Sequence, residues 1–235
     1  MSLTLRGISS MATRLLLNEL VLAYQAHSGV AVAFESVGGV DAAKRVAAGE
    51  AFDVVVLAAD AITKLAATGA VLAETATPLV NSAVAIAVRT GASAPDISNE
   101  VALRHAVLAA HNIGYSTGPS GTALLALFDR WGVTDQIRSR LVQAPPGVPV
   151  GALVARGEVA LAFQQLSELM NLEGVTVIGA MPAPIEIVTT FSAALCRTSS
   201  QPGEARKLLT YVASSATASV KQRHGMQATN SGASQ

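Results

Sequence analysis

Residues 113–122 combine the features of a strand, a tight turn and the start of a helix. Apolar residues lead into a run of small and hydroxyl residues, and we expect a helix that begins at Ser120 or Gly121 and ends at Gly132. The first amides of a helix have no partners within it and lie at the positive end of its dipole, so they bind an anion where they face a cleft. The alternative is that Ser120 only caps its helix.

Three other stretches offer similar neutral donors, namely serine hydroxyls, glycine amides and an asparagine amide. The ligand crevice of a parallel sheet lies at the carboxyl ends of its strands, where loops meet helix starts. The four stretches together predict an anion-binding cleft between two domains. The candidate ligand-binding residues are Ser9, Ser10, Met11, Ser36, Gly38, Gly39, Asn81, Ser82, Ser120, Gly121 and Thr122.

The elements that position these residues alternate between strands and helices. Hydrophobic patterning predicts strands at 3–8, 30–35 and 53–58, and helices at 11–27, 40–48 and 61–67. The run Asp53 to Ala58 is almost wholly apolar, which is typical of a strand buried on both faces of a parallel sheet. The first part of the chain is therefore predicted to be an α/β unit with a mainly parallel sheet.

Two long extended segments, 79–89 and 185–196, enclose a second α/β unit. It is predicted to have helices at 99–109, 120–132 and 150–155, strands at 111–115, 141–144, 159–163 and 175–178, and a helix that begins at Gln164. Closing helices are expected at 203–213 and 216–224, followed by a frayed tail at 227–235. We predict two lobes, 1–82 with 190–235 and 83–189, with the ligand cleft between them. A single doubly wound domain with long edge strands is the alternative.

The composition excludes several classes of function. The formal charge of the 235 residues is zero, 51% are hydrophobic and 14% are charged, which argues against nucleic-acid binding and against disorder. No apolar run approaches the roughly 20 residues of a membrane span, so no membrane insertion is expected. The single cysteine, Cys196, excludes an intrachain disulfide, and its apolar neighbours predict a buried thiol.

Several sequence strings resemble those of a known protein family. Gly7-Ile-Ser-Ser10, Ala48-Gly-Glu-Ala-Phe-Asp-Val54 and Ser120-Gly121 are similar to the molybdate-binding branch of the type II periplasmic solute-binding proteins. The resemblance covers nearly the whole chain. It implies two α/β lobes, each a mainly parallel sheet flanked by helices, joined by two crossing strands. It also implies that Ser9, Ser10, Ser36, Asn81, Ser82 and Ser120 contact the ligand.

The chain departs from the molybdate-binding pattern at two places. Gln164-Gln165 follows the strand after which molybdate binders place a tyrosine, and a Gly-Gly turn precedes Lys44 and Arg45. These residues suit an organic anion, so Gln164 joins the candidate ligand-binding residues. The strings 7–14, 35–45 and 115–121 resemble a subgroup that includes aconitate isomerase, which interconverts cis- and trans-aconitate. A shared scaffold does not by itself establish that activity.

Two functions therefore remain open, binding of a small anion and isomerisation of aconitate. An isomerase needs a general acid or base near the substrate carbon, and the sequence assigns no catalytic residue. Lys44 and Arg14 are candidate charge partners for a carboxylate, although both also suit an exposed helix face. The four histidines have no metal-ligand spacing, so neither a metal nor a cofactor is expected. The resemblance implies a monomer that serves the membrane component of an ABC importer from the periplasm, while a cytoplasmic location stays open.

Overall fold

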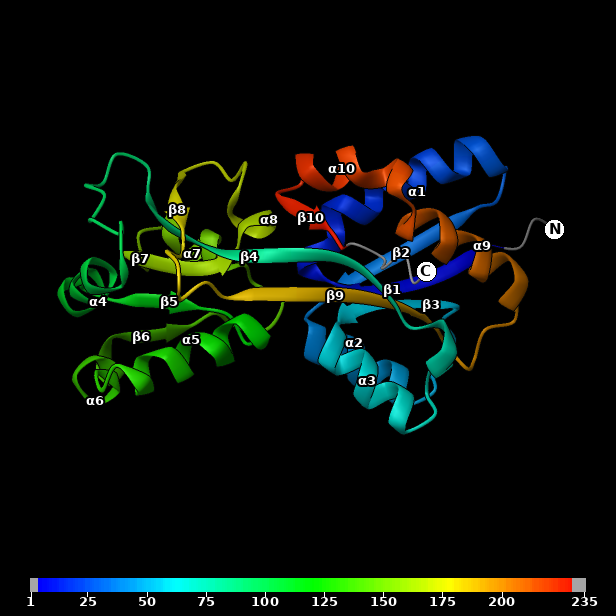
Figure 1. Ribbon diagram of the computed structural model, residues 1–235, viewed down its shortest axis with the longest axis horizontal. Helices are drawn as coiled ribbons and strands as arrows, with labels where there is room; N and C mark the ends of the chain where they lie inside the picture. The colour runs from blue at the N-terminus through cyan, green and yellow to red at the C-terminus, as the bar shows by residue number, and fades with distance from the viewer. Residues whose placement is uncertain (1–3, 230–235) are drawn as a thin grey trace. The chain divides into compact units, whose positions relative to one another are not determined.

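The computed structural model describes residues 4–229, and the chain divides into two compact units. Unit 1 contains the residues up to Ser82 and those from Thr190 onward, and unit 2 contains residues 83–189. Strands β4 (Thr77–Arg89) and β9 (Val188–Leu195) have residues in both units (Figure 1). The chain thus leaves unit 1 through β4 and returns to it through β9.

The sheet of unit 1 is built on three parallel strands. β1 (Leu5–Ser10) lies between β2 (Val32–Val37) and β3 (Val54–Ala58), and β9 runs antiparallel to β3, with Val54 opposite Leu195. All five residues of β3 are buried, as its apolar sequence predicts. The expected parallel arrangement of this α/β unit is confirmed, with antiparallel pairing only where the chain crosses or ends.

Helices cover both faces of this sheet and bury two apolar clusters. α1 (Arg14–Ser28) and α9 (Pro202–Ala213) pack on one face, where α10 (Ala218–Arg223) also lies, and α2 (Gly39–Ala47) and α3 (Ala59–Ala67) pack on the other (Figure 1). Short 3-10 turns complete the unit, η1 (Met11–Thr13), η2 (Ala73–Thr75) and η4 (Ser215–Thr217). The strand ends that carry the candidate serines are thereby fixed by core packing.

Unit 2 repeats this plan with shorter strands. β5 (Ile113–Tyr115) pairs in parallel with β6 (Leu141–Gln143) and β7 (Leu161–Gln165), and β4 runs antiparallel to β7 and to β8 (Val175–Ala180). One apolar cluster involves α4 (Glu100–Ala109), α5 (Pro119–Arg130) and α6 (Thr134–Ile137), after which comes η3 (Arg138–Arg140). The other involves α7 (Val150–Ala155) and α8 (Leu166–Leu169).

The structure corrects three expectations. α5 begins at Pro119 after Gly118, because proline suits the first helical position, so Ser120 is not the capping residue. Gln164 and Gln165 end β7 and do not begin a helix, since they pair with β4. Gln227 is not frayed, because it belongs to β10 (Met226–Ala228), which pairs with β4. Residues 230–235 of that tail, and Leu3 at the start of the first predicted strand, lie outside the described residues. No helix within residues 4–229 is long and apolar enough to cross a membrane.

Candidate functional site

Four of the predicted residues of unit 1 meet at the carboxyl ends of β1 and β2. The parallel register places Ser9 opposite Ser36, and their hydroxyl oxygens are 2.8 Å apart. Ser9 is fully buried and also lies 3.2 Å from the carbonyl oxygen of Ser10. Gly39 begins α2 so close to Ser10 that an added Cβ would lie 3.7 Å from the Ser10 Cβ. Hydroxyls and a helix start thus converge at this sheet edge, as the strand order predicts.

The Ser10 hydroxyl differs from its neighbours because it has no partner. Ser10 ends β1 in an extended conformation, and its side chain does not cap η1. Its Oγ is buried and makes no hydrogen bond within residues 4–229. Met11, the first residue of η1, is half-buried, and Gly38 is the N-cap residue of α2. A buried hydroxyl without a partner costs free energy, so Ser10 is a ready donor for a bound acceptor.

Ser82 provides a second unpartnered hydroxyl on β4. Its side chain is fully buried, and its Oγ has no hydrogen-bond partner in the described part of the chain. Ser82 lies opposite Met226 of β10, whereas the neighbouring Asn81 is half-buried and accepts a hydrogen bond of 2.8 Å from Thr190. The orphaned hydroxyl therefore belongs to the rigid interior of unit 1, not to a loop that could turn to water.

The predicted donors of unit 2 lie in the first turn of α5. Ser120 is buried, and its hydroxyl is 3.1 Å from that of Ser116. Gly121 and Thr122 donate their amides to the Gly118 carbonyl, at 3.0 and 3.2 Å. The Thr122 side chain is exposed, while a Cβ on Gly121 would come within 1.9 Å of the Ser116 carbonyl oxygen. The hydroxyl pair and the helix dipole are thus what this turn can offer an anion.

Gln164 and Gln165 both have buried side chains at the end of β7, but their amides differ. The Gln164 amide nitrogen donates to Glu168 at 2.8 Å, and its oxygen accepts from the Gly151 amide at 3.4 Å. The Gln165 amide nitrogen donates to Thr189 at 2.8 Å, while its Oε1 has no partner among residues 4–229. Gln165 was not among the predicted ligand-binding residues, although it shares the motif that pointed to Gln164.

The predicted charge partners Lys44 and Arg14 are both exposed. Neither is buried together with the candidate serines. Arg45 lies between two carboxylates, at 2.5 Å from Glu35 and 2.6 Å from Glu50, and its guanidinium also stacks over Phe52 at 5.2 Å. These hydrogen bonds to Arg45 lower the pKa of both carboxyl groups. Arg45 is therefore committed to a surface network and not to a ligand.

Sequence reasoning missed a buried cation, Lys221 of α10. Its side chain is 1% exposed, and burial lowers the pKa of its amine. The sequence carries no direct signal for this burial, because lysine in a short closing helix is ordinarily exposed. In the structure Thr217 of η4 lies four residues before Lys221, and both side chains are buried.

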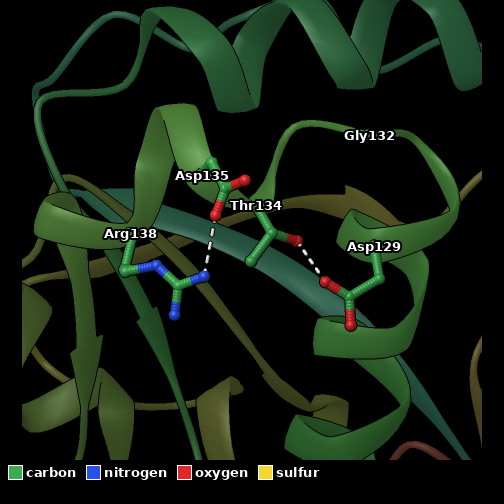
Figure 2. Close-up of a pocket in the computed structure, with 5 residues that line it drawn as sticks. All are labelled: Asp129, Gly132, Thr134, Asp135 and Arg138. Atoms are coloured by element: carbon green, nitrogen blue, oxygen red, sulfur yellow. Dashed lines mark hydrogen bonds and ion pairs between the residues drawn. The ribbon is translucent and has the colours of Figure 1, made fainter.

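A surface pocket of about 190 Å³ lies elsewhere in unit 2, between α5 and η3. Figure 2 shows its lining, in which Thr134 contacts Asp129, and Arg138 donates to Asp135 at 2.8 Å. Arg138 is thus paired with Asp135, Asp129 accepts from the Thr134 hydroxyl, and the lining has no orphaned buried donor. No cluster of three metal-ligating side chains occurs in the described residues.

Comparisons with known proteins identify the family of the chain. Residues 5–227 match the family model described as bacterial extracellular solute-binding protein. The chain is 36% identical to an aconitate isomerase from Pseudomonas sp over 230 residues, which cover 95% of this chain and 87% of the relative.

Solved structures share the fold at low sequence identity. The periplasmic molybdate-binding protein of Azotobacter vinelandii aligns with a TM-score of 0.79 at 16% identity, covering 94% of this chain and 98% of its own. The sulfate-binding protein SubI of Mycobacterium tuberculosis has a TM-score of 0.79 at 17% identity, with coverage of 97% and 88%. The type II periplasmic-binding fold is thereby confirmed. The chain belongs to the bacterial extracellular solute-binding protein family.

Proposed function

We propose that this protein binds a small organic anion, a di- or tricarboxylate, through neutral donors at strand ends and helix starts. The observation that carries the proposal is that two of the predicted serines, Ser10 and Ser82, have buried hydroxyls with no hydrogen-bond partner among residues 4–229. Leaving such a hydroxyl unpaired costs about 1–3 kcal/mol, a cost that an anion oxygen accepting its hydrogen would remove. The proposed ligand contacts are the predicted serines, glycines and asparagine, together with Gln164.

The choice of a carboxylate over a compact oxyanion rests on two supports. Gln164 and Gln165 place amide groups at the end of β7, and each NH₂ group has a second N–H, beyond the one used for Glu168 or Thr189, that suits a carboxylate oxygen. The 36% identical relative is named as an enzyme of aconitate, a tricarboxylate. We further propose that the protein acts as a monomer in the periplasm and delivers its ligand to the membrane component of an ABC importer, as its family membership favours.

Calorimetric titration tests the choice of ligand. The panel contains citrate, cis-aconitate, trans-aconitate, molybdate and tungstate, each at the same ionic strength. We expect saturable binding of at least one carboxylate and much weaker binding of both oxyanions. Tight binding of molybdate alone would overturn the organic ligand, and no heat with any of the five would overturn anion binding altogether.

The identity of the relative favours a second function, isomerisation of aconitate. In this reaction a base removes a proton from the methylene carbon of trans-aconitate, the double bond shifts by one carbon, and a proton returns to the former vinylic carbon. No electrons are gained or lost overall. Incubation of the protein with trans-aconitate in D₂O, followed by chromatography and mass spectrometry, should yield cis-aconitate that carries deuterium. Binding of aconitate without conversion would leave the protein a solute-binding protein only.

A further inference from the structure

Lys221 is a buried lysine of unit 1 that forms no ion pair with any residue in the part of the chain that the structure describes. Its side chain is 1% exposed, and no hydrogen bond or ion pair joins its amine to any residue in the range 4–229. Lysine is almost never fully buried without a partner, since removing an ammonium group from water costs several kcal/mol in the absence of compensation. A stable fold tolerates this cost where a bound partner of opposite charge compensates it.

The elements around α10 carry the unpartnered hydroxyls of unit 1. α10 packs against η4, β10 and α1. Ser214 precedes η4 and has an orphaned buried Oγ, Ser82 lies opposite Met226 of β10, and Ser10 is the last residue before the 3-10 turn that leads into α1. Lys221 and the three orphaned hydroxyls therefore lie on α10 or on elements that adjoin or pair with its neighbours. An anion accepts hydrogen bonds from ammonium groups and from hydroxyls alike.

No carboxylate on these elements is free to neutralise Lys221. β10 and η4 have no titratable side chain. The titratable residues of α1 are Arg14, Glu19, Tyr24 and His27. Glu19, the only carboxylate among them, is bound by Arg223 and lies 2.8 Å from His224 Nε2, both at the end of α10. The missing negative charge is thus not supplied by the described elements that pack most closely on α10.

We propose that Lys221 is the cationic ligand-binding residue of this protein, its ammonium group pairing with a carboxylate of the bound anion. The inference rests on the proposed anion binding and deepens it, because it names the charge that the exposed Lys44 and Arg14 do not provide. An ammonium group is a compact charge with three N–H donors, so it can pair with one carboxylate of the ligand. The serine hydroxyls can then donate to the other carboxylate oxygens of the same ligand. Burial makes the Lys221 amine easier to deprotonate, so binding of the anion should return a proton to it.

The test compares the full-length wild type with Lys221→Met, Lys221→Gln and the control Lys64→Met, which removes an exposed lysine of α3 that lies 3.6 Å from Asp60. Titration with citrate and both aconitate isomers is run at pH 8–9 in two buffers of different ionisation enthalpy. The wild type and the control should take up a fraction of a proton per bound anion. Both Lys221 variants should bind at least about 30-fold more weakly, as expected for loss of one partner of a buried charge pair, and should take up no proton.

The thermal midpoint of the unliganded protein provides a second readout. Lys221→Met should raise it relative to the wild type, because the substitution removes an uncompensated buried charge. Unchanged anion affinity in the folded Lys221→Met and Lys221→Gln variants would overturn the inference and leave the proposed function intact. If the wild type bound none of these anions, the proposed function would fail, and the role of Lys221 with it.

Discussion

Two serine-to-alanine substitutions in unit 1 should change stability in opposite directions. The Ser82 hydroxyl is buried without a partner among the described residues, so Ser82→Ala removes an unpaid desolvation cost of about 1 kcal/mol or more. Ser9→Ala removes a hydroxyl that lies 2.8 Å from Ser36, and it should cost about 1 kcal/mol. Both side chains are fully buried, so the loss of one oxygen atom is matched between the two variants.

The difference between the two variants is therefore about 2 kcal/mol in the free energy of unfolding. For a chain of this length each kcal/mol shifts the melting temperature by about 2–4 °C, so the two melting temperatures should differ by roughly 4–8 °C. Thermal melts followed by circular dichroism, without added anions, measure this shift. Ser82→Ala should also bind the carboxylate ligand more weakly than the wild type does. Equal destabilisation by both substitutions would refute the assignment of Ser82 as an orphaned donor.

Three further predictions concern backbone space, proton linkage and thiol reactivity. Gly121→Ala places a Cβ within 1.9 Å of the Ser116 carbonyl oxygen and should cost more than about 2 kcal/mol, whereas Gly203→Ala meets no atom within 4 Å and should be neutral in a denaturation series. The lowered pKa of Lys221 means that the unfolded chain holds this proton to higher pH, so wild-type stability should rise relative to Lys221→Met up to about pH 10.5. Burial raises the pKa of Cys196 to about 12, so a thiol reagent at pH 7 should label it only as the protein unfolds; rapid labelling of the native state would contradict this.

Much of the fold follows from local sequence signals. The uninterrupted apolar run of β3 predicts a strand buried on both faces, and the helices of unit 1 follow from their apolar spacing. β10 was missed because three residues at a polar chain end carry almost no pattern, and only its pairing with β4 makes it a strand. Gln164 and Gln165 were misread for a related reason, since their place in β7 depends on contacts with a strand far away in the sequence.

The sequence indicates which donor groups lie at the strand ends, but not which of them have hydrogen-bond partners. Strand-to-helix turns rich in serine and glycine identified Ser9, Ser10 and Ser36, because local sequence determines where a strand ends. Whether a hydroxyl finds a partner depends on tertiary packing, so the contrast between Ser9 and Ser10 is visible only in three dimensions. Lys221 was missed on the same ground, since its burial is set by the elements that pack around α10.

The return of the chain through β9 has a consequence for biosynthesis. Unit 2 is one continuous segment, 83–189, whereas the sheet of unit 1 needs Leu195 opposite Val54 and its core needs Leu208 and Leu209 of α9. A ribosome therefore completes unit 2 before it has synthesised β9 and α9, which unit 1 needs for its sheet and core. Domains ordinarily fold from the N-terminus onward. In this protein the N-terminal strands must wait, with apolar surface exposed, until the last segment emerges.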